Sequence, residues 1–223
     1  MTTRILSIKE MIYDKTFAEE LARDLLKINA VILRPDNPFS WASGWNSPIY
    51  CDNRLTLRYP EIRKKIARKL TDAIEKHFPD VEVITGTATA GIPHAAWVAS
   101  NLDKPLAYVR ARAKSYGLGN QIEGGVDKGQ KTVVIEDLIS TGGSAMSVVD
   151  ALQFIGADVQ GVVTIFTYGF DKANEQFDMA NLPLYALTDY KTLINVAVDE
   201  GYIKKESLQL LNSWRANPET WPN

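Results

Sequence analysis

Two adjacent acids, followed by hydroxyl-bearing and small residues, form the stretch of this sequence best suited to chemistry, residues 133–144. An apolar Val-Val-Ile run precedes Glu136 and Asp137. The residues after the acids are Leu138, Ile139, Ser140, Thr141, Gly142, Gly143 and Ser144. This order predicts a buried strand that ends in two acids, then a glycine-containing turn, then the start of a helix.

Each part of this stretch can bind one part of a phosphorylated sugar. Backbone N–H groups at a helix start bind phosphate together with the helix dipole, and the hydroxyls of Ser140, Thr141 and Ser144 can add donors. Glu136 and Asp137 are poor phosphate ligands, because like charges repel, but they are good acceptors for adjacent sugar hydroxyls. The stretch therefore predicts a site for a ribose 5-phosphate.

Other interpretations of the stretch fit less well. An ordinary strand-to-helix turn also carries capping serines and threonines, but paired acids at the end of a buried strand argue against it, because uncompensated buried charge is costly. The sequence lacks the Gly-x-x-x-x-Gly-Lys-Ser/Thr run of a nucleoside-triphosphate loop, and it has no Gly-x-Gly-x-x-Gly after a strand.

The elements that must position this stretch alternate along the chain. Strands are predicted at 81–84, 106–109, 131–135, 159–166 and 184–187, with helices at 93–100, 143–154 and 172–180. Amphipathic spacing before them predicts helices at 16–28 and 60–78 and short strands at 30–35 and 47–52. The alternation indicates an α/β fold whose parallel sheet is covered on both faces. Ligands of such sheets bind beyond the carboxyl ends of the strands.

Between residues 110 and 130 the apolar periodicity stops. This segment begins with three basic residues, Arg110, Arg112 and Lys114, and it contains several glycines. A connection this long inside a compact domain is usually a functional lid or a disordered segment. Because basic residues and glycines occur together, we favour a flexible lid loop.

Composition limits the remaining possibilities. The chain has 223 residues, 45% of them hydrophobic, and a net charge of −2, which predicts one domain over residues 1–223 and no nucleic-acid footprint. The single cysteine, Cys51, cannot form an internal disulfide and is interpreted as a packed thiol in a reducing compartment. Neither a signal peptide nor a membrane-spanning run is predicted, so we expect a cytoplasmic protein.

Several motifs together resemble those of type I phosphoribosyltransferases, and within that family those of orotate phosphoribosyltransferases. The likeness covers roughly residues 17–214. Its motifs are residues 47–54 (Ser-Pro-Ile-Tyr-Cys-Asp-Asn-Arg), 86–92 (Gly-Thr-Ala-Thr-Ala-Gly-Ile), 108–110 (Tyr-Val-Arg), 119–124 (Gly-Asn-Gln-Ile-Glu-Gly) and 136–144. The resemblance implies a type I phosphoribosyltransferase-like parallel sheet flanked by helices. It also implies a small N-terminal hood, formed largely by about residues 1–55, and a lid loop at about 110–130.

The resemblance also assigns roles to residues. Residues 136–144 would hold the ribose hydroxyls and the 5-phosphate of phosphoribosyl pyrophosphate, with Asp137 and Lys114 as the catalytic residues. Thr87 and its neighbours would line the pyrophosphate. Ser140 and Tyr50 would border orotate.

Lid residues complete the expected site. The resemblance implies that Arg110 and Lys114 reach the pyrophosphate across a homodimer interface, and it places Tyr116 beside the same substrate. Mg²⁺ would be bound mainly through the substrate, with no metal site made by the protein alone.

Four positions depart from the family pattern. Lysines common in some members are replaced by Ala42 and Ala90, and a basic residue after Arg110 is replaced by Ala111. The usual loop histidine is Tyr116, which cannot carry a positive charge, so no imidazolium is expected to assist catalysis there.

The implied reaction joins orotate N1 to C1 of the ribose and expels pyrophosphate, giving orotidine 5′-phosphate for UMP biosynthesis. Its transition state should resemble an oxocarbenium ion, so positioning and charge stabilisation matter more than acid–base chemistry. Two alternatives remain: a purine phosphoribosyltransferase, and a non-catalytic regulator that senses phosphoribosyl pyrophosphate. We do not expect a fusion with a decarboxylase, because 223 residues leave no room for a second barrel domain.

Overall fold

The computed structural model describes residues 12–40, 46–111 and 121–221. A central six-stranded sheet has the strand order β10-β9-β8-β5-β6-β7. The strands are β5 (Val83–Thr87), β6 (Leu106–Val109), β7 (Ile122–Glu123), β8 (Lys131–Ile139), β9 (Asp158–Thr167) and β10 (Leu184–Asp189). All neighbours pair in parallel except β6 and β7, which pair antiparallel. The predicted parallel sheet is confirmed, with one antiparallel edge strand added.

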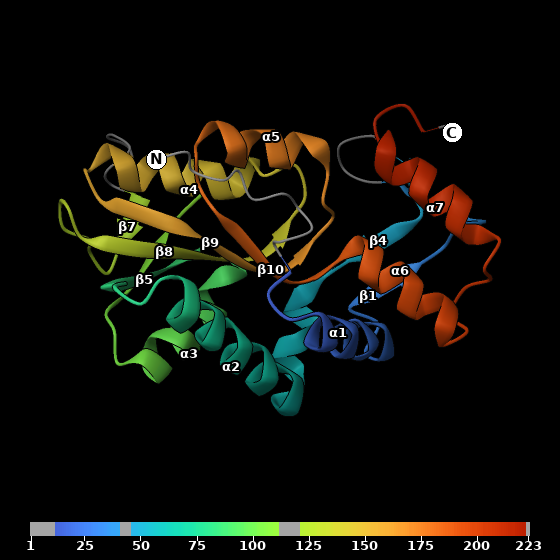
Figure 1. Ribbon diagram of the computed structural model, residues 1–223, viewed down its shortest axis with the longest axis horizontal. Coiled ribbons are helices and arrows are strands. Elements are labelled where there is room, and N and C mark those ends of the chain that lie inside the picture. Colours follow the sequence, from blue (N-terminus) through green and yellow to red (C-terminus); the bar gives the residue numbers. More distant parts are fainter. Residues whose placement is uncertain (1–11, 41–45, 112–120, 222–223) are drawn as a thin grey trace.

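Helices cover both faces of this sheet (Figure 1). α2 (Pro60–His77) and α3 (Gly91–Leu102) lie on one face, and α4 (Gly143–Phe154) and α5 (Asp171–Met179) lie on the other. Alternate residues of β8 divide between the two faces: Val133 and Ile135 join one apolar cluster and Val134 joins the other. This two-residue period explains why the strand is apolar without interruption.

The N-terminal hood is built beside the sheet. α1 (Lys15–Lys27) is capped by Asp14, whose side chain accepts a hydrogen bond from the backbone N–H of Phe17. β1 (Val31–Leu33) pairs antiparallel with β4 (Ile49–Cys51), and β2 (Phe39–Ser40) pairs antiparallel with β3 (Asn46–Ser47). A 3₁₀ helix, η2 (Asn53–Arg58), leads from β4 into α2.

Two C-terminal helices follow the sheet, α6 (Tyr190–Asp199) and α7 (Ser207–Ala216). Neither helix is among those predicted from the sequence. α6 packs against α1, and its buried residues include Tyr190, Leu193 and Ile194. Figure 1 shows both helices on the hood side of the molecule.

The site strand differs from its predicted bounds. β8 continues to Ile139, four residues beyond the predicted end at 135, because Leu138 and Ile139 pair with Phe166 and Thr167 of β9. Glu136 and Asp137 therefore lie within the carboxyl-terminal half of β8 rather than after it. The segment predicted as a lid also differs in part, since Ile122 and Glu123 form β7.

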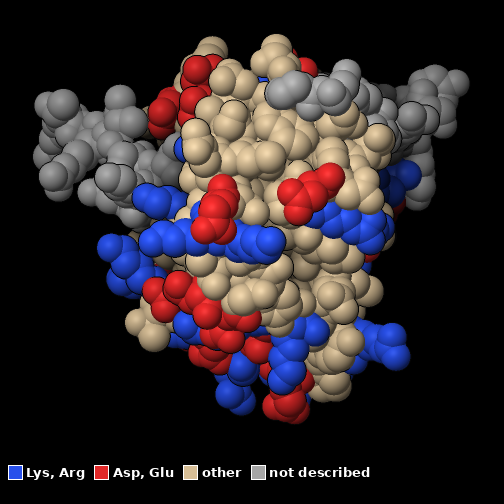
Figure 2. Space-filling model, turned by 90° about the vertical axis from the view of Figure 1, so that its right-hand side faces the viewer, with Lys and Arg blue, Asp and Glu red and all other residues tan. Residues whose placement is uncertain are grey.

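Charges of both signs are mixed on the hood side, as far as the described residues show it (Figure 2). Figure 2 shows Lys and Arg side chains interspersed with Asp and Glu over the lower part of that face, below an area with few charged residues. Within the described part of the chain, no helix combines the length and apolar character needed to cross a membrane.

Candidate active site

The two acids of β8 are held by local hydrogen bonds. Glu136 is buried, with 4% of its surface exposed, whereas Asp137 is half-buried. Oε1 of Glu136 accepts a hydrogen bond of 2.9 Å from the backbone N–H of Asp137. Oε2 accepts one of 3.4 Å from the hydroxyl of Ser144, at the start of α4. The Glu136 carboxylate thus lies against the helix start and is fixed in orientation.

Burial makes these acids costly to ionise. It raises the pKa of Glu136 well above its usual range, and the neighbouring charge of Asp137 adds to the effect. Burial also raises the pKa of Asp137. Such a pair gains stability from hydroxyl donors or a cation bound beside it, so the arrangement suits a ligand that supplies one or both.

The turn after β8 has the backbone shape of an anion site. Gly142, at the N-cap of α4, has a φ of +89°, a conformation that favours glycine, and no side chain caps the helix there. Gln176 of α5 donates a hydrogen bond of 3.1 Å to the backbone carbonyl of Thr141. The first amides of α4 are therefore left without a side-chain cap, as a helix start that binds an anion requires.

A second loop lies beside the acids because two strands pair in register. Gly86 of β5 is opposite Ile135 of β8, which places Thr87 next to Glu136 on the neighbouring strand. A Cβ at Gly91 would overlap the carbonyl oxygen of Ile135, so only glycine lets α3 begin this close to β8. The loop 87–90 is thereby held beside the two acids.

Asn53 is a site residue that sequence reasoning missed. Its side chain is buried, and its amide donates a hydrogen bond of 2.7 Å to the backbone carbonyl of Asp137. The hydroxyl of Thr56 in turn donates to the carbonyl of Asn53, at 2.6 Å. Its place in the motif 47–54 could have marked Asn53 as a site residue. Its contact with Asp137, 84 residues later, cannot be inferred from the spacing of residues in the sequence.

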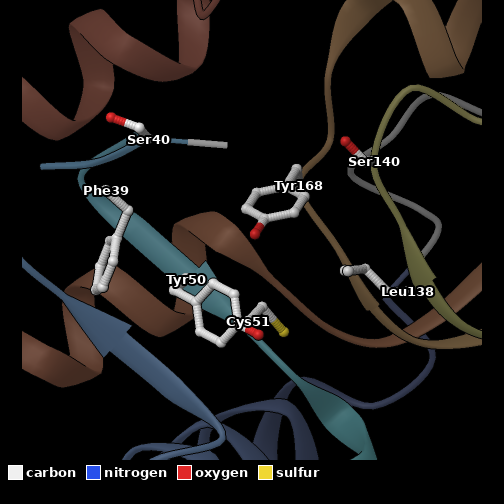
Figure 3. A pocket seen from close by; sticks show the side chains of 7 residues that line it. All are labelled: Phe39, Ser40, Tyr50, Cys51, Leu138, Ser140 and Tyr168. Atoms are coloured by element: carbon white, nitrogen blue, oxygen red, sulfur yellow. The ribbon is translucent and has the colours of Figure 1, made fainter. Parts of the chain in front are cut away.

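A cavity of about 430 Å³ opens next to the turn. It is lined by Phe39, Ser40, Tyr50, Cys51, Leu138, Ser140 and Tyr168. Figure 3 shows Phe39 and Tyr50 on one side and Leu138 and Ser140 on the other, with the hydroxyl of Tyr168 directed into the space between them. The structure thus brings together Tyr50 and Ser140, which sequence analysis assigns to the same ligand.

Cys51 contributes a protonated thiol to this cavity. Burial raises its pKa well above the usual range, and the charges of Asp137 and Asp52 add to the effect. Its Sγ lies 3.5 Å from Oδ1 of Asn53. The raised pKa disfavours the thiolate, which agrees with the prediction of a packed thiol rather than a nucleophile.

The basic residues assigned to the lid are only partly within the described chain. Arg110 follows β6, and its Nε lies 3.2 Å from Oε1 of Glu123 in β7. Its backbone N–H donates to the carbonyl of Gln121. Lys114, Tyr116 and Ala42 lie outside the described residues.

A family model described as "Phosphoribosyl transferase domain" matches residues 56–197. An orotate phosphoribosyltransferase of Halalkalibacterium halodurans is 56% identical over 92% of this chain and 99% of its own length. One of Bacillus subtilis is 57% identical over 90% of this chain and 93% of its own length. The chain belongs to the orotate phosphoribosyltransferase family.

Solved structures of this family share the fold. The orotate phosphoribosyltransferase of Aeropyrum pernix superposes with a TM-score of 0.71 at 29% identity, over 82% of this chain and 99% of that one. The UMP synthase of Leishmania donovani gives a TM-score of 0.76 at 26% identity over 90% of this chain, which spans 42% of that longer protein. The type I phosphoribosyltransferase fold expected from the motifs is confirmed.

Proposed function

We propose that this chain transfers ribose 5-phosphate from phosphoribosyl pyrophosphate to orotate, giving orotidine 5′-phosphate and pyrophosphate. The observation that carries the proposal is that Leu138 and Ser140 belong both to the acid-containing segment and to the wall of the cavity. A sugar phosphate bound at the segment would therefore hold its C1 near a base in the cavity. The high identity with orotate phosphoribosyltransferases supports orotate as that base.

The substrate parts are assigned by the chemistry of each group. The 5-phosphate would bind the turn 140–144 through backbone amides and hydroxyls. Glu136 and Asp137 would accept hydrogen bonds from the ribose hydroxyls, and Thr87 with the loop after it would contact the pyrophosphate. Tyr50 and Ser140 would border orotate.

Mg²⁺ fits this site as a substrate-bound ion. Glu136 is buried and Asp137 is half-buried, and a neighbouring cation would lower again the pKa that burial raises in each carboxyl group. Within the described residues there is no group of three or more His, Cys, Asp or Glu side chains that could hold a metal. When bound, Mg²⁺ would neutralise charge on the pyrophosphate, and the two acids would meet it beside the ribose hydroxyls.

The reaction needs positioning more than proton transfer. Orotate N1 reacts as an anion with C1 as pyrophosphate departs, so the protein must hold two anions in line and stabilise the leaving one. The anion-binding turn and the amides of the loop 87–90 hold one substrate, and the cavity wall orients the other. Closure of a lid would exclude water, which would otherwise hydrolyse the activated ribose.

Lid residues and a second subunit complete the proposal. Arg110, Lys114 and Tyr116 would act on the pyrophosphate in the neighbouring subunit of a homodimer. The family resemblance supports this arrangement, and the ion pair between Arg110 and Glu123 must then open when Arg110 reaches a substrate.

A turnover assay with a panel of bases tests the function. Purified protein should release pyrophosphate from phosphoribosyl pyrophosphate with orotate, and only when Mg²⁺ is present. Adenine, hypoxanthine and uracil are tested in the same assay as comparison bases. Turnover with any of these and none with orotate would refute the proposal in favour of another phosphoribosyltransferase.

A further inference from the structure

Helix α7 packs directly behind one wall of the cavity. Trp214 of α7 is fully buried, and its ring meets the rings of Tyr168 at 5.8 Å and Phe170 at 5.5 Å, both edge to face. Tyr168 and Phe170 are themselves stacked at 5.2 Å with nearly parallel planes. The Tyr168 ring, which Figure 3 shows at the cavity, is therefore packed against a C-terminal residue.

Hydrogen bonds attach the same helix to both walls. Nε1 of Trp214 donates to the carbonyl of Asn46 at 3.0 Å, and Asn46 pairs with Ser40 in the hairpin of β2 and β3 that carries Phe39. One residue later, Nη1 of Arg215 donates to the carbonyl of Gly169 at 2.6 Å, in the turn that follows Tyr168. Adjacent residues of α7 thus bind the hairpin wall and the Tyr168 wall.

We propose that α7 is a positioning element for the base, in which Trp214 and Arg215 set the separation between the hairpin wall and the Tyr168 wall. This inference rests on the assignment of the cavity to orotate. Neither residue lines the cavity, so both act through the residues that do.

The hydrogen bonds of Trp214 and Arg215 restrict where the two cavity walls can lie. An indole N–H is a donor only, and leaving it buried without an acceptor is costly, so the Asn46 carbonyl is held at one place. Gly169 has a φ of +64°, and its N–H donates to the hydroxyl of Thr167 at 3.1 Å. The turn after Tyr168 is therefore constrained both by its own hydrogen bond to Thr167 and by the hydrogen bond from Arg215.

The position of these parts in the sequence supports a role in base selection. The match to the shared phosphoribosyltransferase domain covers residues 56–197 and includes the acids and the anion-binding turn. The hairpin and α7 both lie outside that range, on either side of it. Parts that set the shape of the base site can differ among enzymes that use different bases. The hairpin carries lining residues of the cavity, and α7 supports that hairpin from behind without lining the cavity itself.

Two variants test the inference in the full-length protein. Trp214→Phe keeps an aromatic ring and removes the N–H, and Arg215→Met keeps an apolar stem and removes the bond to Gly169. Each should raise the KM for orotate by roughly two- to tenfold, the effect of one hydrogen bond. The KM for phosphoribosyl pyrophosphate should change by less than about twofold, because the turn 140–144 does not contact α7 through these bonds.

Direct binding gives a second measurement. In calorimetric titrations, both variants should bind orotidine 5′-phosphate more weakly by the same factor and bind ribose 5-phosphate as the unaltered protein does. Ser213→Ala, on the exposed side of α7, is the matched control on the same helix. Ile74→Val, in the buried face of α2, controls for lost stability without a change at the cavity.

Phe39→Ala separates failure of the inference from failure of the cavity assignment. If Phe39→Ala weakens orotate binding while Trp214→Phe and Arg215→Met do not, α7 has no positioning role. If none of the three variants alters orotate binding, the cavity is not the base site, and the inference falls with that assignment. Equal losses for orotate and phosphoribosyl pyrophosphate in the α7 variants would show a purely structural role.

Discussion

The side-chain amide of Asn53 donates a hydrogen bond of 2.7 Å to the backbone carbonyl of Asp137. Asn53→Ala removes this bond and leaves a buried carbonyl without its donor, so we expect a loss of roughly 1–3 kcal/mol in unfolding free energy. Because the bond also holds β8 at the acids, kcat/KM should fall as well. Urea denaturation and steady-state kinetics check both, with exposed Asn212→Ala as control. Unchanged kinetics would show that the bond stabilises the fold without positioning the acids.

Asp137→Asn keeps the size of the side chain and removes its charge. If Asp137 accepts a hydrogen bond from the ribose, kcat/KM should fall by the equivalent of roughly 1–3 kcal/mol. Asp150→Asn, on the exposed side of α4, should have no such effect. Wild-type kinetics for the Asp137 variant would show that this side chain is not a ligand.

Glu136→Gln should stabilise the substrate-free protein at high pH. Burial raises the pKa of Glu136 in the folded state, so the folded protein holds its proton more tightly than the unfolded chain does. Near pH 4 both states are largely protonated, and the substitution should have little effect. As pH rises above the unfolded pKa, ionisation increasingly destabilises the folded wild-type protein, so the stability gained by the variant should grow from pH 4 to pH 8.

Unfolding free energies at pH 4, 6 and 8 test this prediction. Glu61→Gln changes an exposed glutamate of α2 and should give no pH-dependent gain. A variant less stable than wild type at pH 8 would mean that the Glu136 carboxylate is already compensated in the substrate-free protein.

His94 should make the protein sensitive to acid. Burial lowers its pKa to about 4, while that of the unfolded chain stays near the usual value of about 6.5. Between these values only the unfolded state takes up the proton, so stability should fall by about 1.4 kcal/mol for each pH unit as the pH is lowered. His94→Gln should remove this slope between about pH 6 and 4.5, whereas His77→Gln, at a more exposed position, should change it less. An unaltered slope in the His94 variant would place the acid sensitivity elsewhere.

Lys114 provides a test of the shared site. Lys114→Ala should lower kcat strongly and leave folding stability nearly unchanged, because the sequence around it has no core-facing periodicity. Mixed with Asp137→Asn chains, it should regain activity, since each mixed dimer would contain one site with both residues intact, up to about half the wild-type value. No recovery, with mixed dimers verified by mass spectrometry, would mean that the loop acts on its own subunit.

Periodic patterns predicted the framework of this fold. The helix predicted at 143–154 has the observed bounds of α4, and the strand at 106–109 those of β6. Local signals determine these bounds, such as Gly142 and Gly143 at the start of α4 and the apolar runs of the strands. Tyr190, Leu193, Ile194 and Ala197 carry the same kind of signal for α6, and it was missed.

The sequence could not predict which segments far apart along the chain contact each other in the fold. Tyr168 reaches the cavity because β9 pairs with β8, and its backbone N–H then donates to the carbonyl of Ile139. The extension of β8 past Asp137 depends on the same pairing. Phe39 and Cys51 join Tyr168 only because the hood packs beside this edge of the sheet, which no local periodicity encodes.

Ser140 belongs to the turn 140–144 and also lines the cavity, so under the proposed assignment the two substrate subsites share this residue. A ligand at the turn would then restrain part of the cavity wall, which would make the two binding equilibria thermodynamically linked. Linkage is reciprocal: whatever factor a bound sugar phosphate adds to the affinity for the base, the base adds to the affinity for the sugar phosphate.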